Sequence, residues 1–300
     1  MRINPNSMPD LLAALDQAQL AEQQASLEIA SGSSVNEPSD NPTAAALLIE
    51  NNDQTRFNAG YLQNLSTINS QLSAANSTLS SVQTALQQAV SLGVEGANGT
   101  LSASDRAAIV SQLQGIQSQV ISLANTSYQG TYLFGGTVTS EAPYTVNPVD
   151  PSGSGVTYNG NGDVNKVSVG DGYQIEINQP GSQLFSASGN SVFLALNQLI
   201  QALQSNSGIE TAVTSLTSAA NYLSAQSVFY GNAMDQAQSQ TTYLNAVKLQ
   251  LAQQQNTIGG VDLADAANQL AQDQTDTQAA LEAISKISSQ GTLFNYLTQG

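Results

Sequence analysis

YLQNLSTINSQLSAANSTLSSVQTALQQA, residues 61–89, is a run in which apolar or small residues recur at alternating intervals of four and three. Gln, Ser, Asn, Thr and Ala fill most positions between them. This spacing is a heptad seam, typical of a helix that packs lengthwise on another helix. No Pro or Gly interrupts residues 61–92. We therefore predict a helix that begins near Pro42 and is roughly 75 Å long at 1.5 Å per residue.

The same spacing recurs in residues 109–123 and 209–251. A short Gly-containing connection, in which Ser102 and Asp105 have capping-box spacing, separates the first two seams, so we predict an antiparallel helical hairpin. The residues predicted to form the core of this rod share the seam phase. They are Leu65, Ile68, Leu72, Leu79, Val82, Leu86, Ile109, Leu113, Ile116, Val120, Leu216, Leu223, Leu244 and Leu251.

Residues 130–189 lack the helical period and are rich in Gly, Pro and β-branched residues. Residues 156–158, 164–169 and 173–177 have the composition of short strands, and Asn159-Gly160 and Asn161-Gly162 are pairs typical of hairpin turns. Asn159, Asn161 and Asp163 also have the alternate spacing of a calcium loop. Val164 stands where such a loop needs Gly, so we favour a plain hairpin.

A helix is predicted at each end of the chain, with Asp10 and Asp262 as N-terminal caps. Leu12, Leu20 and Leu27 form a second apolar line on the first helix. Both helices are polar and rich in Ala, so each would bury little apolar surface by itself. We therefore expect them to become ordered only when they pack among copies of the chain. The residues predicted to contact neighbouring copies are Leu11, Leu15, Ile29, Leu263, Leu270, Leu281 and Ile284.

The predicted fold is mainly α, a long antiparallel helical bundle or coiled coil with a β-rich insertion and with the N- and C-terminal helices together at one end. Terminal helices occupy residues 1–42 and 258–300. The helical rod is predicted in residues 43–130 and 190–257. The β-rich outer domain is predicted in residues 131–189.

The amino-acid composition excludes several classes of function. Charged residues are 9% of the chain, against about 25% in typical domains, so copies can pack closely without burying charge. The net charge is −16 and the six basic residues are scattered, which argues against nucleic acid as a partner. No apolar run approaches the length of a membrane span, and we expect no membrane insertion. We also expect any export to proceed without a cleaved signal peptide.

Catalytic motifs are missing from the sequence. The chain has no His and no Cys, so zinc and haem lose their usual ligands, and we predict no metal and no cofactor. No lysine follows a Ser at a distance of three residues, and neither a G-x-S-x-G nor a phosphate-binding Gly motif occurs. We therefore predict that the chain is not an enzyme.

Several motifs, in this order and spacing, resemble the flagellar hook-filament junction proteins, the flagellin-like family of hook-associated protein 3. The first is Ser31-Gly32 followed by Glu37-Pro-Ser-Asp-Asn-Pro-Thr-Ala-Ala-Ala46. Ala97-Asn-Gly-Thr-Leu-Ser-Ala-Ser-Asp-Arg-Ala107 comes next. The others are Leu123-Ala-Asn-Thr126, Gly130-Thr-Tyr-Leu-Phe-Gly-Gly136, Val156-Thr-Tyr-Asn-Gly160, Gly181-Ser-Gln-Leu-Phe185 and the ending Leu293-Phe-Asn-Tyr-Leu297.

This resemblance implies an extracellular protein of the bacterial flagellum, exported through the flagellar type III channel. Its terminal helices would form the inner tube of the axial structure. It would join the hook, through another hook-associated protein, to the flagellin filament, and an export chaperone would bind the region from Ile258 to Leu297. The alternatives are a flagellin filament subunit, which shares the helical frame, and an extracellular adhesin that uses the β-rich insertion.

Overall fold

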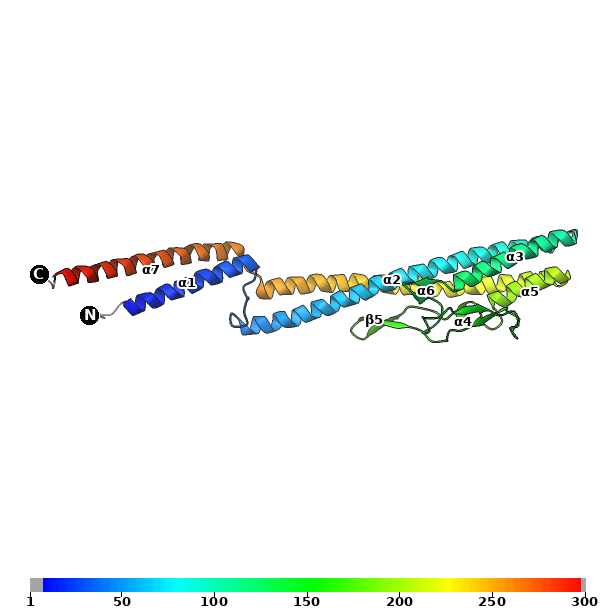
Figure 1. The fold of residues 1–300 in the computed structure, drawn as a ribbon, viewed down its shortest axis with the longest axis horizontal. Coiled ribbons are helices and arrows are strands. Elements are labelled where there is room, and N and C mark those ends of the chain that lie inside the picture. Colours follow the sequence, from blue (N-terminus) through cyan, green and yellow to red (C-terminus); the bar gives the residue numbers. More distant parts are fainter. Residues whose placement is uncertain (1–7, 298–300) are drawn as a thin grey trace. The chain divides into compact units, whose positions relative to one another are not determined.

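The structure, a computed structural model, describes residues 8–297 and the side chains of residues 8–287. The helices are α1 (Met8–Ser31), α2 (Pro42–Gly96), α3 (Ala103–Ala124), α4 (Gly181–Leu184), α5 (Val192–Ser205), α6 (Ile209–Gly259) and α7 (Leu263–Leu297) (Figure 1). The predicted fold class, mainly helical with long antiparallel helices and a small strand insertion, is confirmed.

The helices begin where the sequence places caps. Pro42 opens α2, and the Asn41 side chain accepts a hydrogen bond from the Ala44 N–H at 3.1 Å. Ser102 and Asp105 form the predicted capping box before α3. These contacts satisfy backbone donors that have no partner within the first helical turn.

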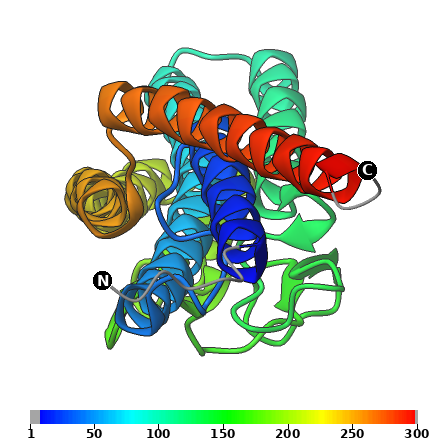
Figure 2. The same ribbon diagram turned by 90° about the vertical axis from the view of Figure 1, so that its left-hand side faces the viewer.

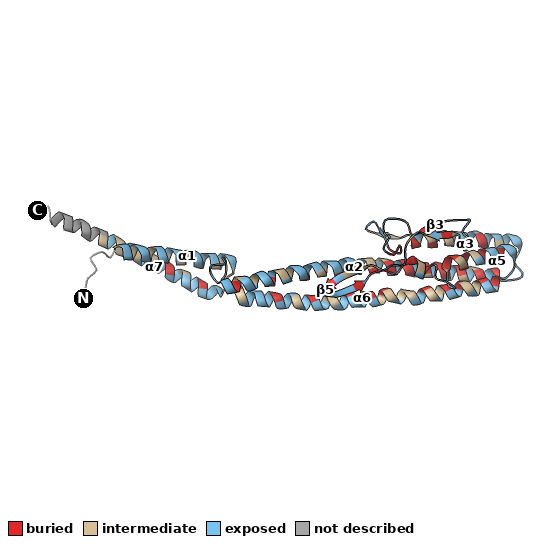
Figure 3. Ribbon diagram, turned by 90° about the horizontal axis from the view of Figure 1, so that it is seen from below, coloured by how far each residue is buried: buried red, intermediate tan, exposed pale blue. Residues whose placement is uncertain are grey.

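The described residues form two compact units. The first holds residues 8–57 and 246–297, and the second holds Asn58–Asn245. In the second unit, α3 and α5 pack on one another and on the facing stretches of α2 and α6. Buried residues concentrate along these four helices and the nearby strands (Figure 3). All fourteen residues predicted for the rod core are buried, Leu251 among them in the first unit.

Six short strands fill the β-rich stretch: β1 (Ser127–Tyr128), β2 (Thr131–Tyr132), β3 (Tyr144–Val146), β4 (Val156–Tyr158), β5 (Lys166–Gly170) and β6 (Tyr173–Glu176). They pair as three separate antiparallel hairpins, β1–β2, β3–β4 and β5–β6. An aromatic cluster lies beneath them, in which Phe134, Tyr144, Phe185 and Phe193 are buried and in ring contact.

The predicted hairpin turns at residues 159–162 are wrong. β4 pairs with β3, and β5 pairs with β6, so these residues connect two different hairpins. The Asn161 side chain is held by Thr137: its Oδ1 accepts from the Thr137 N–H at 2.8 Å, and its Nδ2 donates to Thr137 Oγ1 at 2.6 Å. A long-range contact therefore overrides the local preference for a turn.

Candidate functional site

The two terminal helices, α1 and α7, lie side by side in the first unit and run antiparallel (Figures 1 and 2). We call them the terminal pair. The connections that follow α1 and precede α7 are joined by a short antiparallel bridge between Ser33 and Gly260. The Ser34 N–H donates to the Gly259 carbonyl at 2.8 Å, and the Val261 N–H donates to the Gly32 carbonyl at 3.4 Å. These bonds hold the end of α1 close to the beginning of α7.

α1 presents a seam of small and apolar residues to the pair. Ala25 is its only fully buried residue. Leu11, Leu15 and Ile29 have the same heptad phase and are partly buried. Glu22 shares this phase and is also partly buried, so a carboxylate interrupts an otherwise apolar seam.

The seam of α7 is more polar than that of α1. Ala266 and Asp273 are buried, while Leu270, Thr277 and Ile284 are partly buried at the same alternating spacing. Asp273 is 6% exposed, and its Oδ1 accepts from Gln269 Nε2 at 3.0 Å. Its Oδ2 and the Thr277 hydroxyl are buried without a hydrogen-bond partner. Because buried polar groups without partners cost free energy, these residues weaken the terminal pair.

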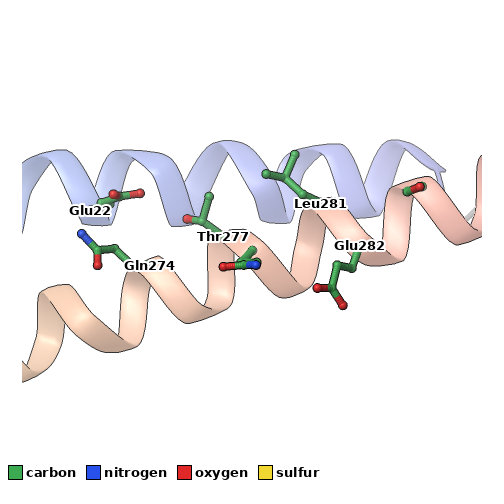
Figure 4. A pocket seen from close by; sticks show the side chains of 7 residues that line it. Glu22, Gln274, Thr277, Leu281 and Glu282 are labelled. Carbon is green, nitrogen blue, oxygen red and sulfur yellow. The ribbon is translucent and has the colours of Figure 1, made fainter.

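An open groove of about 500 Å³ runs between α1 and α7 (Figure 4). Its lining residues are Glu22, Gln274, Thr277, Gln278, Leu281, Glu282 and Ser285. The terminal pair carries an excess of negative charge. α1 contains four acidic and no basic residues, and α7 contains four acidic residues and one lysine. The groove thus combines carboxylates with the half-exposed Leu281 and offers no catalytic constellation.

Several leucines of the terminal pair are exposed. Leu12, Leu20 and Leu27 are 53%, 59% and 58% exposed on α1, and Leu263 and Leu281 are exposed on α7. Of the seven predicted contact residues, the structure leaves these last two in solvent and turns the other five toward the seam. The terminal pair therefore has an inner seam and a separate outer apolar line on α1.

Sequence reasoning missed the buried Asp273 and the partly buried Thr277. Asp273 and Thr277 follow Ala266 and Leu270 in one fours-and-threes spacing, whereas the predicted residues follow the other such spacing, which runs through residues 267 and 274. Leu263, Leu270 and Ile284 fit both spacings, and Leu281 fits only the predicted one.

No group of three potential metal-ligating side chains occurs among the described residues. Within the same part of the chain, no helix is both long and apolar enough to cross a membrane. The tyrosines of the β-rich stretch do not form an exposed aromatic surface: Tyr144 is buried, Tyr158 is half-buried and hydrogen-bonded to the Phe134 carbonyl, and Tyr173 is partly exposed.

The N-terminal helices resemble a known family. Residues 3–139 match the family described as the bacterial flagellin N-terminal helical region. The matched stretch covers α1, α2 and α3. This part of the chain is therefore flagellin-like.

Two curated relatives are both named flagellar hook-associated protein 3. The Escherichia coli K12 protein is 30% identical over 208 residues, which is 63% of each chain. The Salmonella typhimurium LT2 protein is 37% identical over 118 residues, 39% of this chain and 37% of the relative. The chain thus spans less than two thirds of the length of either relative. The predicted resemblance to hook-associated protein 3 is confirmed by both matches.

A solved structure described as a flagellar hook-associated protein of Vibrio parahaemolyticus has a similar fold. The two superpose with a TM-score of 0.66 at 22% identity, over 74% of this chain and 100% of the Vibrio chain. The comparison shows that a helical frame with this arrangement of elements occurs in an experimental structure.

Proposed function

We propose that this chain is a structural protein of the bacterial flagellum that joins the hook to the flagellin filament. It would contact the hook through another hook-associated protein and assemble through its own terminal helices. Support comes from the names of both curated relatives and from the flagellin-like N-terminal region. The proposed action is mechanical, and it requires surfaces that bind other subunits.

The outer leucine line of α1 carries this proposal. Three large apolar side chains, spaced by eight and then seven residues, are exposed on a helix whose inner seam is already occupied. A repeated apolar line of this kind is the requirement for packing against a further helix. An axial structure grows only if each subunit contacts the next through two different surfaces, since self-complementary contacts close into dimers. The outer line and the acidic groove are two such surfaces.

The flagellin-like match also favours a second candidate, a subunit of the filament itself. Both candidates need the same helical frame and differ in where the protein resides. We favour the junction because both curated relatives are named flagellar hook-associated protein 3.

Location and further partners are part of the proposal. The protein would be extracellular and exported without a cleaved signal peptide. Besides itself, its partners would be flagellin, the neighbouring hook-associated protein and, before export, a chaperone at the region from Ile258 to Leu297. The low helical stability expected of the terminal pair would suit passage through a narrow channel.

The test replaces the outer line with polar residues of high helix propensity. A Leu12→Gln, Leu20→Gln, Leu27→Gln variant should keep the helical circular-dichroism spectrum of the parent. In a strain that produces it in place of the parent, most hooks should lack filaments in electron micrographs. The matched control carries Val94→Gln and Val228→Gln, exposed residues of α2 and α6, and should assemble normally. A normal number of filaments with the leucine variant would contradict the proposal.

A further inference from the structure

Two long helices, α2 and α6, pack through a seam whose apolar positions repeat. Direct polar contacts between the two helices are few in the second unit; one is the Asn58 side chain, which donates to the Leu244 carbonyl at 3.0 Å. Within the second unit, Leu65 and Ile68 of α2 and Ala237 and Leu244 of α6 are buried at this level. Heptad seams repeat, so a slip of seven residues, about 10 Å along the axis, restores a similar apolar contact. The apolar positions alone therefore allow more than one register, and polar contacts must select among them.

The β5–β6 hairpin supplies contacts to both helices. Asn64 of α2 donates through Nδ2 to the Ser168 carbonyl at 3.0 Å. Gln240 of α6 donates through Nε2 to the Val169 carbonyl, also at 3.0 Å. Ser168 and Val169 are neighbours in β5, so one short strand binds a side-chain amide from each long helix. Figures 1 and 3 show β5 beside α2 and α6.

Contacts with the core and between the two strands hold the β5–β6 hairpin in place. Val169 and Ile175 are buried against the core of the second unit. Lys166 and Glu176, which are paired across the two strands, form an ion pair at 3.0 Å. At the base of the hairpin, Asn178 Oδ1 accepts from the Asn165 N–H at 2.6 Å, and Asn178 Nδ2 donates to the Gly136 carbonyl at 3.0 Å. The two carbonyls therefore have fixed positions.

A second attachment links the chain after β6 to α6. The Gln179 N–H donates to the hydroxyl of the buried Tyr230 at 3.2 Å, and Gln179 Nε2 donates to Gln226 Oε1 at 3.3 Å. Gly170 permits the close approach at the other end, because a β-carbon there would lie 2.8 Å from Gln240 Nε2.

We propose that the β5–β6 hairpin is a clamp that locks the register of α2 against α6. A slip of one heptad would carry Asn64 or Gln240 about 10 Å from its carbonyl, far outside hydrogen-bond distance. The inference concerns the isolated chain and is independent of the flagellar function.

The test measures register directly. The chain has no cysteine, so Ser66→Cys and Ser239→Cys place one spin label on α2 and one on α6. In the parent, electron-electron resonance should give a single narrow distance distribution. Adding Asn64→Ala and Gln240→Ala should broaden it or add a second distance. The matched control, Asn76→Ala with Gln238→Ala, removes exposed amides of the same helices and should leave the distribution narrow.

Hydrogen exchange gives a second measurement. Amides at residues 60–70 and 237–245 should exchange about ten-fold faster in the Asn64→Ala, Gln240→Ala variant, as expected for the loss of two modest hydrogen bonds. Those of α3 and α5 should be unchanged. A single narrow distribution with unchanged exchange would overturn the clamp.

If the double variant fails to fold, the Gly170→Ala variant provides the test. Its added methyl group displaces only the Gln240 amide and so removes the hydrogen bond from Gln240 to the Val169 carbonyl. A broadened distance distribution in this variant supports the clamp. A distribution as narrow as that of the parent overturns it.

Discussion

Gly93 of α2 lies so close to Val213 of α6 that a β-carbon at residue 93 would stand 2.7 Å from Val213 Cγ2. Leu199 of α5 is also within 3.0 Å of that position. Glycine in a helix costs about 1 kcal/mol relative to alanine, so its presence here is explained by the space that the two neighbouring helices require.

Gly93→Ala should therefore destabilise the second unit despite its better helix propensity. We expect a loss of about 1–2 kcal/mol in the free energy of unfolding, because Val213 and Leu199 must shift within a packed core. Gly60→Ala is the matched control on the same helix, where an added β-carbon meets nothing within 4 Å. It should gain about 0.5–1 kcal/mol. Urea unfolding followed by circular dichroism measures both, and equal effects would contradict this account of the packing.

The buried carboxylate of Asp273 should make the terminal pair less stable than its length allows. Asp273→Ala removes an oxygen that has no partner and should stabilise the pair by about 1–2 kcal/mol. Asp276→Ala, at an exposed position of the same helix, gains helix propensity alone. Slower hydrogen exchange of α1 and α7 in the first variant than in the second is the expected result. The same exchange rates in both would show that burial of Asp273 carries no cost.

Alkaline pH should unfold the second unit through its buried tyrosines. Burial raises the pKa of the Tyr144 and Tyr230 hydroxyls well above their usual value, which is near 10 in unfolded chains. A raised folded-state pKa gives stability that is complete below about pH 10 and is lost as the pH rises toward the folded value.

Ultraviolet absorbance follows the ionisation of tyrosine. Tyr144 and Tyr230 should ionise only together with the loss of the helical signal. Tyr144→Phe should reduce the alkaline sensitivity, whereas Tyr243→Phe, at an exposed position, should not. Ionisation of every tyrosine while the helical signal persists would be inconsistent with the buried positions.

Removal of the residues after Gly260 should leave a folded second unit that cannot enter the axial structure. The truncation deletes α7 and keeps every contact of residues 58–245. A circular-dichroism melt should retain the main transition of the parent, and the truncated chain should be missing from isolated flagella. Global unfolding of the truncated chain would contradict the division into terminal helices and rod.

Some core and capping residues could be predicted from the sequence alone, and others could not. Leu65, Leu72, Leu79 and Leu86 could be predicted as core, because a single periodicity determines which helix face is apolar. The caps at Asn41 and Ser102 follow from local chemistry. Local patterns could not locate Asn125, whose side chain donates to the Tyr144 carbonyl and accepts from its N–H, both at 2.8 Å.

The misassigned turn at Asn161 has the same cause, since Thr137 lies 24 residues away in the chain. Asn51 and Asn58 are a third case. They are buried and donate to the Leu251 and Leu244 carbonyls, yet their polar character conceals their place in the seam. The environment of each of these side chains depends on a partner that is far away in the sequence. A single sequence does not identify which residues are such partners.

Immunogold electron microscopy of intact flagella tests the central claim most directly. An antibody against the β-rich stretch, residues 131–189, should label a single point between the hook and the filament. Label along the whole filament would identify a flagellin subunit and contradict the junction. Absence of label from flagella altogether would contradict the flagellar function.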